Sequence, residues 1–505
     1  MSAPRGTVEG AAPLPARGFS FKALFGDMAL YSFGNMLIKG LSLISAPIFT
    51  RLFSPGEYGA WSFISAVIAF LTGILLLGGD DAYTRYYFEC KSDEERKSLT
   101  TTWFLFLAVW SHLVVLALLP FSRAITVMLL EHQIFKLAWI TALAFSPAAM
   151  LNMLLSQALR NQFKARAFTI LNVITAALTL ILSVVFALNF RLGITGALLG
   201  AGIASLIMIP VRIYSIRGLL TRKLSRAYLK KLLLFGLPLV PVSLAFWLFS
   251  NADRIMLIKM DSLEKAGLYA ISSSMVAVLS LLHNAVGQSW QPHAIKLYEE
   301  DREKAKAVFS RTMTYLTAGA GLAVVAFVAL SQEVLYILVP PAYYASFQPI
   351  PYLALGIMFF MTAQVTVVGI LVHNKTLYIM IACWIFALVN VVLNYFLIPH
   401  WGIAGAGAAT GISYFLFTLS YLFLSQKLWP VPYDWGNLAL LLLISIAATA
   451  MIVLVEAAIE GLWICLAVKL FLVFLAALAM LFLMNRSGYI DAGAICSSLL
   501  SRIKS

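Results

Sequence analysis

The sequence predicts an all-α integral membrane protein with about fourteen transmembrane helices, most of them in two copies of one unit. Three observations lead to this fold class. The 505 residues are 61% hydrophobic and 11% charged, whereas soluble proteins are about 45–50% apolar and about 25% charged. Long apolar stretches recur along the whole chain, and two sets of short motifs repeat at nearly the same separation.

The apolar stretches define the expected helices. A helix needs roughly 20 apolar residues to cross a bilayer, where only helices or closed barrels satisfy the backbone. Runs as long and uniformly apolar as these favour helices. They cover residues 28–50, 59–80, 99–122, 133–157, 167–189, 194–215, 229–252, 266–290, 308–331, 345–372, 377–398, 402–425, 435–456 and 461–484. Four prolines inside or beside them are expected to kink or end helices: Pro47, Pro238, Pro241 and Pro292.

The basic residues predict the orientation. With the N-terminus in the cytoplasm, most of the 36 Lys and Arg fall on the inside, as the positive-inside rule requires. The link at 212–231 is the richest inside segment and carries seven of them. Residues 1–27 lack the apolar core of a signal peptide and are expected to form a loose cytoplasmic arm. The net charge of +14 thus follows from orientation, and no nucleic-acid partner is expected.

An internal repeat relates the two halves of the chain. Arg51–Trp61 aligns without gaps with Lys259–Tyr269, and Leu192–Ala197 matches Trp401–Ala406 at nearly the same separation. Each copy holds six expected helices. Because six is even, both copies face the same way, as in a parallel repeat.

The repeat gives the expected domain organisation. Two homologous bundles around a cavity are typical of alternating-access transporters, and the alternative is a duplication in another kind of membrane protein. We expect two parallel six-helix repeats to form a V-shaped pair of lobes around a central cavity. The parts are a cytoplasmic arm (1–27), an N-terminal lobe (28–215), a basic cytoplasmic linker (216–228), a C-terminal lobe (229–425), two further helices (426–484) and a cytoplasmic tail (485–505).

Small residues and cysteines add little chemistry. Glycines at 193, 196, 200 and 202, and at 402, 405, 407 and 411, have spacings that let helices pack closely. No GxxxxGK[ST] motif is present, so ATP is not expected to supply the energy directly. The cysteines are scattered without a CxxC pair, which indicates neither a metal site nor a disulfide framework; they are Cys90, Cys383, Cys465 and Cys496.

Three segments carry a family resemblance: Ala46–Gly59 after the first helix, then Phe235–Pro241 and Asn251–Arg254 around the seventh. With the two six-helix lobes and two extra helices, the chain resembles the polysaccharide-transporter branch, with its Wzx-like oligosaccharide flippases, of the multidrug/oligosaccharidyl-lipid/polysaccharide (MOP) superfamily. The motifs are specific to the superfamily and much weaker for the substrate.

The resemblance implies a function. It implies a flippase that moves an undecaprenyl-pyrophosphate-linked oligosaccharide across the bacterial inner membrane, with both termini cytoplasmic. O-antigen, capsule and exopolysaccharide repeat units all fit. Membrane lipids and a polysaccharide polymerase or export complex are the further expected partners, and no cofactor is expected.

Charged groups inside a membrane span are costly, so each is a candidate for function. Lys39 lies near the middle of the first helix with Asn35 on the same face, and either contacts pyrophosphate or sugar or pairs with a carboxylate. Arg254 follows the seventh helix and suits phosphate. With Asp253 it alternatively forms an ion pair that closes a periplasmic gate.

A second charged group is expected at the inner end of the second helix. Asp80, Asp81 and Arg85 form an inward gate, a cation-coupling site or a solvated helix end. Nearby, Arg160 attracts either the anionic substrate or lipid headgroups. His283 in the eighth helix is either a proton-coupling group or a core residue with satisfied hydrogen bonds.

Amides complete the candidates. Within the helices they suit sugar hydroxyls, or they join helices by hydrogen bonds; they are Gln288, Gln364, Asn390 and Asn394. Lys469 is expected to pair with Glu456 or Glu460, in a structural or lipid-facing role.

Two other functions make different demands on the sequence. A cation-coupled drug antiporter favours a lumen dominated by acidic residues, whereas the deep candidates here are cations and amides. A membrane glycosyltransferase or polymerase commonly has acidic residues in the first outward loop or a large periplasmic loop. The first outward loop, 51–58, offers only Glu57, so we expect no enzyme.

Overall fold

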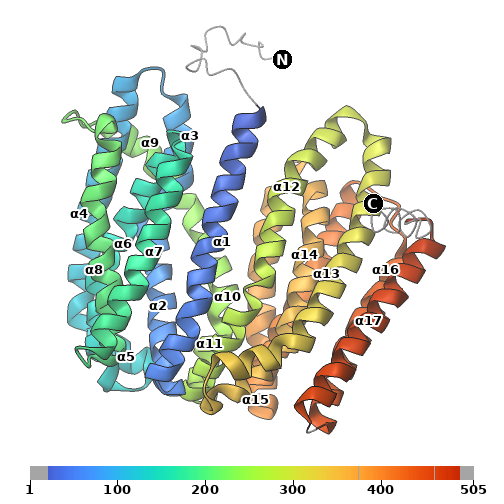
Figure 1. The fold of residues 1–505 in the computed structure, drawn as a ribbon. Helices are drawn as coiled ribbons and strands as arrows, with labels where there is room; N and C mark the ends of the chain where they lie inside the picture. The colour runs from blue at the N-terminus through green and yellow to red at the C-terminus, as the bar shows by residue number, and fades with distance from the viewer. Residues whose placement is uncertain (1–20, 374, 460, 490–505) are drawn as a thin grey trace, which may run out of the picture. The chain divides into compact units, whose positions relative to one another are not determined.

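The computed structural model describes residues 21–373, 375–459 and 461–489, and all regular structure in these residues is helical (Figure 1). The chain divides into two compact units. Residues up to Phe53 and Ala60–Trp247 form the first, and Ser54–Gly59 with the residues from Leu248 onward form the second. The boundary between Trp247 and Leu248 thus falls inside a helix.

In its described residues the first unit contains eight whole helices, all of α2 except its first turn, and the start of α10. They are α1 (Phe21–Leu52), α2 (Pro55–Leu75), α3 (Gly79–Glu89), α4 (Asp93–Leu118), α5 (Ser122–Leu130), α6 (Lys136–Asn161), α7 (Ala165–Leu188), α8 (Gly193–Ile216), α9 (Arg226–Gly236) and α10 (Val240–Met260). The helix α7 packs against both α1 and α8, and α6 packs against α8. A buried core around Tyr83, Trp103 and Leu154 fills the space between α3, α4 and α6.

The second unit continues α10 and adds seven helices. They are α11 (Leu263–Val276), α12 (Leu279–Glu300), α13 (Arg302–Leu338), α14 (Ile350–Leu371), α15 (Thr376–Leu428), α16 (Trp435–Ala458) and α17 (Leu462–Arg486). The helix α14 packs against α12, α13 and α15, while α16 and α17 lie side by side against α13 (Figure 1).

The expected number of spans agrees with the helices. Among the described residues twelve helices are long and apolar enough to cross a membrane, or thirteen if α11 and α12, bent by 45°, count as one span. The 53 residues of α15 are far too many for one crossing. They comprise two helices that meet at Gly402, where φ is 53° and ψ is −129°. If α11 and α12 count as one span and α15 counts as two, the described residues contain fourteen candidate spans, the number that the sequence predicts.

Two boundaries differ from the expected ones. The second apolar stretch breaks between α2 and α3 at Leu77 and Gly78, both in the left-handed region, so Asp80 begins a new helix. This break packs against a second one at Gly236, before Pro238. There α9 ends and α10 begins. The helix expected at 229–252 is therefore two helices, and the second of them runs on to Met260.

The repeat is visible in local structure. Ser54 and Ser262 occupy equivalent positions, and each Oγ accepts a hydrogen bond from a backbone N–H three residues ahead, at 3.3 and 3.2 Å, as N-cap residues do. Gly193 and Gly402 are also equivalent, with φ of 54° and 53°. Only glycine adopts this conformation readily, so both copies make the same turn before the same helix.

The remaining glycines let helices approach closely, as expected. A Cβ on Gly196 or Gly200 of α8 would overlap the backbone of α7, and one on Gly405 would overlap the backbone of Leu397. Cys90, Cys383 and Cys465 are buried and free, while Cys496 lies outside the described residues.

Candidate functional site

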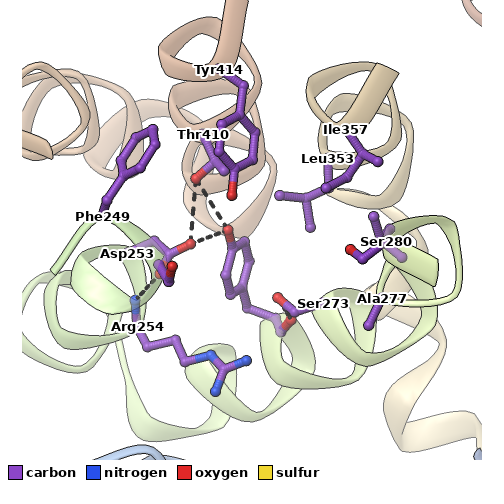
Figure 2. Close-up of a pocket in the computed structure, with 13 residues that line it drawn as sticks. Phe249, Asp253, Arg254, Ser273, Ala277, Ser280, Leu353, Ile357, Thr410 and Tyr414 are labelled. Carbon is purple, nitrogen blue, oxygen red and sulfur yellow. Dashed lines mark hydrogen bonds between the residues drawn. The ribbon is translucent and has the colours of Figure 1, made fainter. Parts of the chain in front are cut away.

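A buried carboxylate is the centre of a polar network in the second unit. Asp253, only 5% exposed, lies on α10 and accepts hydrogen bonds from three neighbours. Its Oδ1 accepts from the Arg254 backbone N–H at 2.8 Å, and its Oδ2 accepts from the Tyr269 hydroxyl and from Thr410 Oγ1, the latter at 3.4 Å. Figure 2 shows Asp253 and Thr410 pointing toward each other. The network thus joins α10, α11 and α15.

Two of the expected amides extend this network. Asn390 Nδ2 donates to Thr410 Oγ1 at 3.3 Å, and Asn394 Nδ2 donates to Asn390 Oδ1 at 3.0 Å. All three side chains are buried. The turn at Gly402 makes this possible, because it folds the second half of α15 back beside the half that carries both asparagines.

A small cavity of about 150 Å³ adjoins the network. Its wall includes Asp253, Arg254, Tyr269, Ser273 and Thr410. Carboxylate and hydroxyl oxygens are ligands of protons and hard cations, so the side of the wall formed by Asp253, Tyr269 and Thr410 suits a small cation, whereas Arg254 adds a positive charge to the same wall. Among the described residues no group of three or more His, Cys, Asp or Glu is placed to hold a metal ion.

Asp253, Asn390 and Asn394 are separate candidates in the sequence, and the structure brings them together. It also corrects the position of Asp253 and Arg254, which lie inside α10 and not after its end. Tyr269 and Thr410 were missed. Tyr269 aligns with Trp61 in the repeat. The sequence feature that points to Tyr269 is this aromatic position, which carries a hydroxyl in only one of the two copies.

His283 and Gln364 form a separate pair. Gln364 Nε2 and His283 Nε2 lie 2.8 Å apart, and the imidazole stacks on Phe360 with ring centroids 4.4 Å apart. Gln364 therefore hydrogen-bonds a neighbouring helix. Gln288 on the same helix as His283 is exposed.

The charged group of α3 does not form one cluster. Arg85 pairs with Glu89 at 2.9 Å, with both side chains about half exposed, and its guanidinium lies 4.9 Å from the centre of the Phe235 ring. Asp81 is exposed, and Asp80 is half-buried at the wall of a cavity in the first unit. These three residues lie on α3 and not at the end of the second helix. Because their side chains have different surroundings, they do not form the single cluster that the expected gate requires.

Lys39 and Asn35 are exposed on α1. Within the part of the chain that the structure describes, no hydrogen bond or ion pair is found for the Lys39 ammonium group. A cation at this depth of a membrane span faces water or a charged ligand more favourably than lipid, so the expected role of Lys39 in substrate contact remains a proposal.

The prediction from the sequence assigned Arg212 to the wrong segment. Arg212 was counted with the basic link at 212–231, but it lies inside α8 and is only 1% exposed. It lines the first-unit cavity, of about 470 Å³, together with Asp80, Arg160 and the side chains of Ser156 and Asn172 among others. The sequence feature that points to a position inside the helix is the mostly apolar segment after Arg212, with which α8 continues to Ile216.

Comparisons with known proteins agree with this fold. The profile of the family described as "Polysaccharide biosynthesis protein" matches residues 25–298, more than half of the chain. A search of curated proteins gave no match. Among solved structures, the lipid II flippase MurJ in an inward closed conformation is similar at 16% sequence identity and a TM-score of 0.74, covering 91% of this chain and 99% of that one.

Multidrug transporters are similar as well. An inward-facing MATE-family transporter of the MOP superfamily has 15% identity and a TM-score of 0.66, covering 77% of this chain and 94% of that one. The Vibrio cholerae MATE transporter VcmN in its bent form has 16% identity and a TM-score of 0.57, covering 80% of this chain and 96% of that one. At these identities the likeness concerns the fold. The family profile goes further, and the chain belongs to the family described as "Polysaccharide biosynthesis protein".

Proposed function

We propose that this chain flips an undecaprenyl-pyrophosphate-linked oligosaccharide from the cytoplasmic to the periplasmic leaflet of the bacterial inner membrane. The product would supply O-antigen, capsule or exopolysaccharide synthesis. The observation that carries the proposal is the match of residues 25–298 to a polysaccharide biosynthesis family in a chain with the fold of a lipid II flippase.

The polar interiors support a transport role. Each unit contains a cavity with buried polar side chains inside an assembly of apolar helices. Buried polar groups within membrane spans mark pathways for substrates or ions. A lipid-linked sugar needs cations for its pyrophosphate and amides and aromatic faces for its sugars, and Lys39, Arg254 and Gln288 are the proposed contacts.

We place ion coupling at Asp253. Its carboxylate and the hydroxyls of Tyr269 and Thr410 would bind a proton or a small cation, and occupancy would bias one of two states of an alternating-access cycle. His283 is a weaker candidate, because its Nε2 is already engaged by Gln364.

A drug antiporter is the second candidate function. The buried Asp253 and the likeness in fold to MATE transporters favour it, because an acidic interior suits a cationic drug. The first unit favours the flippase instead, because two arginines and a single carboxylate line its cavity.

Reconstitution in proteoliposomes decides between these functions. The full chain is inserted with a pyrophosphate-linked oligosaccharide lipid, and its accessibility in each leaflet is followed with and without a proton or sodium gradient. Protein-dependent translocation is the expected result. Movement of a cationic dye without movement of the lipid would favour the antiporter, and movement of neither would reopen the enzyme alternative.

A further inference from the structure

The first unit buries an arginine that has no acidic partner. Arg212 on α8 donates from Nη1 to Ser156 Oγ, and from Nη2 to Thr175 Oγ1 at 2.7 Å and Asn172 Oδ1 at 3.0 Å. A longer hydrogen bond reaches the Leu171 carbonyl oxygen at 3.3 Å. All four acceptors are neutral, and Nε has no hydrogen-bond partner among the described residues.

This arrangement leaves a positive charge uncompensated. Removing a guanidinium from water carries a penalty of several kcal/mol that neutral acceptors offset only in part. The other deeply buried cation among the described residues, Lys469, has two carboxylates within 3 Å. Arg212 has none in the described part of the chain, so an anion that enters the cavity from solution would be its first acidic partner.

The cavity beside Arg212 has room for such an anion. Its volume of about 470 Å³ lies in the usual range of small-molecule sites, roughly 300–1,000 Å³. Six of the side chains that line it can form hydrogen bonds: Asn152, Ser156, Gln157, Asn172, Thr175 and Ser205. Such groups suit phosphate oxygens and sugar hydroxyls.

The charged side chains at the cavity wall are mostly positive, as an anion site requires. Arg160 and Arg212 face one carboxylate, Asp80, and among the described residues neither arginine forms an ion pair with it. Arg160 is exposed and donates from Nη2 to Gln157 Oε1. The two arginines therefore offer one cation in contact with water and one buried cation at the wall of the same cavity.

We propose that this cavity is an anion site for a phosphate or pyrophosphate group, with Arg212 as its principal cation. A planar guanidinium donates to two phosphate oxygens at once, which an ammonium group does not do. An entering anion would replace neutral acceptors such as Ser156 and Asn172. The identity of the natural occupant rests on the proposed function: it would be the pyrophosphate of the lipid carrier.

Protection of a reporter thiol tests the site. Met153 lines the same cavity and is 49% exposed, so Met153→Cys should react with a water-soluble maleimide, quantified by mass spectrometry. The native thiols give little background, since three are buried and burial raises the pKa of the Cys90 thiol. Inorganic pyrophosphate at ten times its Kd should slow labelling by about tenfold.

Matched variants make the test specific. Ser289→Cys places a thiol at the wall of a second-unit cavity lined by Trp290, His293 and Tyr315 without an arginine, and pyrophosphate should leave its labelling unchanged. Sodium chloride at equal ionic strength should protect neither position. Adding Arg212→Gln to Met153→Cys should abolish protection, and Arg212→Lys should keep part of it.

The outcomes separate the proposals. No protection in the Met153→Cys protein, or equal protection after Arg212→Gln, overturns the site, because an arginine that only joins helices would not respond to pyrophosphate. Should Arg212→Gln aggregate, the comparison of pyrophosphate with chloride still decides. The assay needs no translocation, so a failed flippase leaves the anion site standing, and an active flippase without protection rejects the site alone.

A final arm identifies the source of the phosphate. The labelling is repeated in nanodiscs with and without phosphatidylglycerol, using the full chain. Protection by pyrophosphate in both supports the carrier lipid as the occupant. Protection by phosphatidylglycerol alone, with no further effect of pyrophosphate, supports a headgroup phosphate in the same site.

Discussion

At the scale of single residues, buried charges in this chain differ in how they are balanced. Lys469 on α17 is completely buried, and its Nζ lies 2.5 Å from Glu333 Oε1 and 2.7 Å from Glu456 Oε2. The sequence suggested Glu456 or Glu460 as the partner. The structure shows Glu456 and adds Glu333 from α13, while Glu460 lies outside the described residues.

Replacing Lys469 should therefore destabilise the protein. Lys469→Met leaves two carboxylates buried side by side, and breaking a buried ion pair in this way costs about 3–5 kcal/mol. Thermal unfolding in detergent, followed by tryptophan fluorescence, should show a clearly lower midpoint. The control is Lys296→Met, because Lys296 and its partner Glu300 are exposed and such surface pairs contribute about 0–1 kcal/mol. Equal midpoints for the two variants would contradict this prediction.

Asp253→Asn should uncouple transport from the ion gradient. The amide keeps the size of the side chain but removes the negative charge that a cation needs. In proteoliposomes the gradient-stimulated rate should fall to the rate without a gradient, while the midpoint of unfolding changes little. Asp261→Asn, at an exposed carboxyl just after α10, should keep its stimulation. Full stimulation in Asp253→Asn would move the coupling site elsewhere.

At the scale of elements, the repeat places two equivalent glycines against each other. A Cβ on Gly267 of α11 would overlap the Pro55 carbonyl oxygen and lie 2.9 Å from the Gly59 backbone nitrogen. Both atoms belong to backbone, which cannot rotate away as a side chain can. This contact explains why both copies of the repeat have glycine at this position.

Gly267→Ala should lower stability by about 1–3 kcal/mol, the usual cost of overpacking. Gly73→Ala is the matched control, because no heavy atom lies within 4 Å of its added Cβ. There the change should be neutral or stabilising, since alanine favours a helix over glycine by roughly 0.5–1 kcal/mol. The midpoints of thermal unfolding in detergent compare the two, and an unchanged midpoint for Gly267→Ala would show that the helices separate without loss.

At the scale of the whole molecule, flipping requires that the charged group of the substrate cross an apolar barrier. Lys39 and Arg254 are the candidate cations outside the first-unit cavity. Lys39→Ala and Arg254→Ala should each slow flipping roughly ten- to hundredfold, because a charge-assisted hydrogen bond is worth about 1.5–3 kcal/mol. Membrane insertion should be normal in both. Lys375→Ala, at an exposed position between α14 and α15, is the control, and full activity in both test variants would remove Lys39 and Arg254 from the substrate path.

The sequence by itself determined the membrane class, the all-helical fold and the count of spans, because the length of an apolar stretch is read directly along the chain. It also determined the repeat, whose equivalent serines and glycines adopt the same local structure in both copies. Each of these properties depends on residues that are near one another in sequence.

Only the tertiary structure decided which polar groups meet. Asn390 and Thr410 meet beside Asp253 because α15 turns back at Gly402, and Arg212 is buried because α8 packs against α6 and α7. In a soluble helix the polar face marks the side away from the core. Here lipid and core are both apolar, so a uniformly apolar helix does not reveal which of its faces is buried.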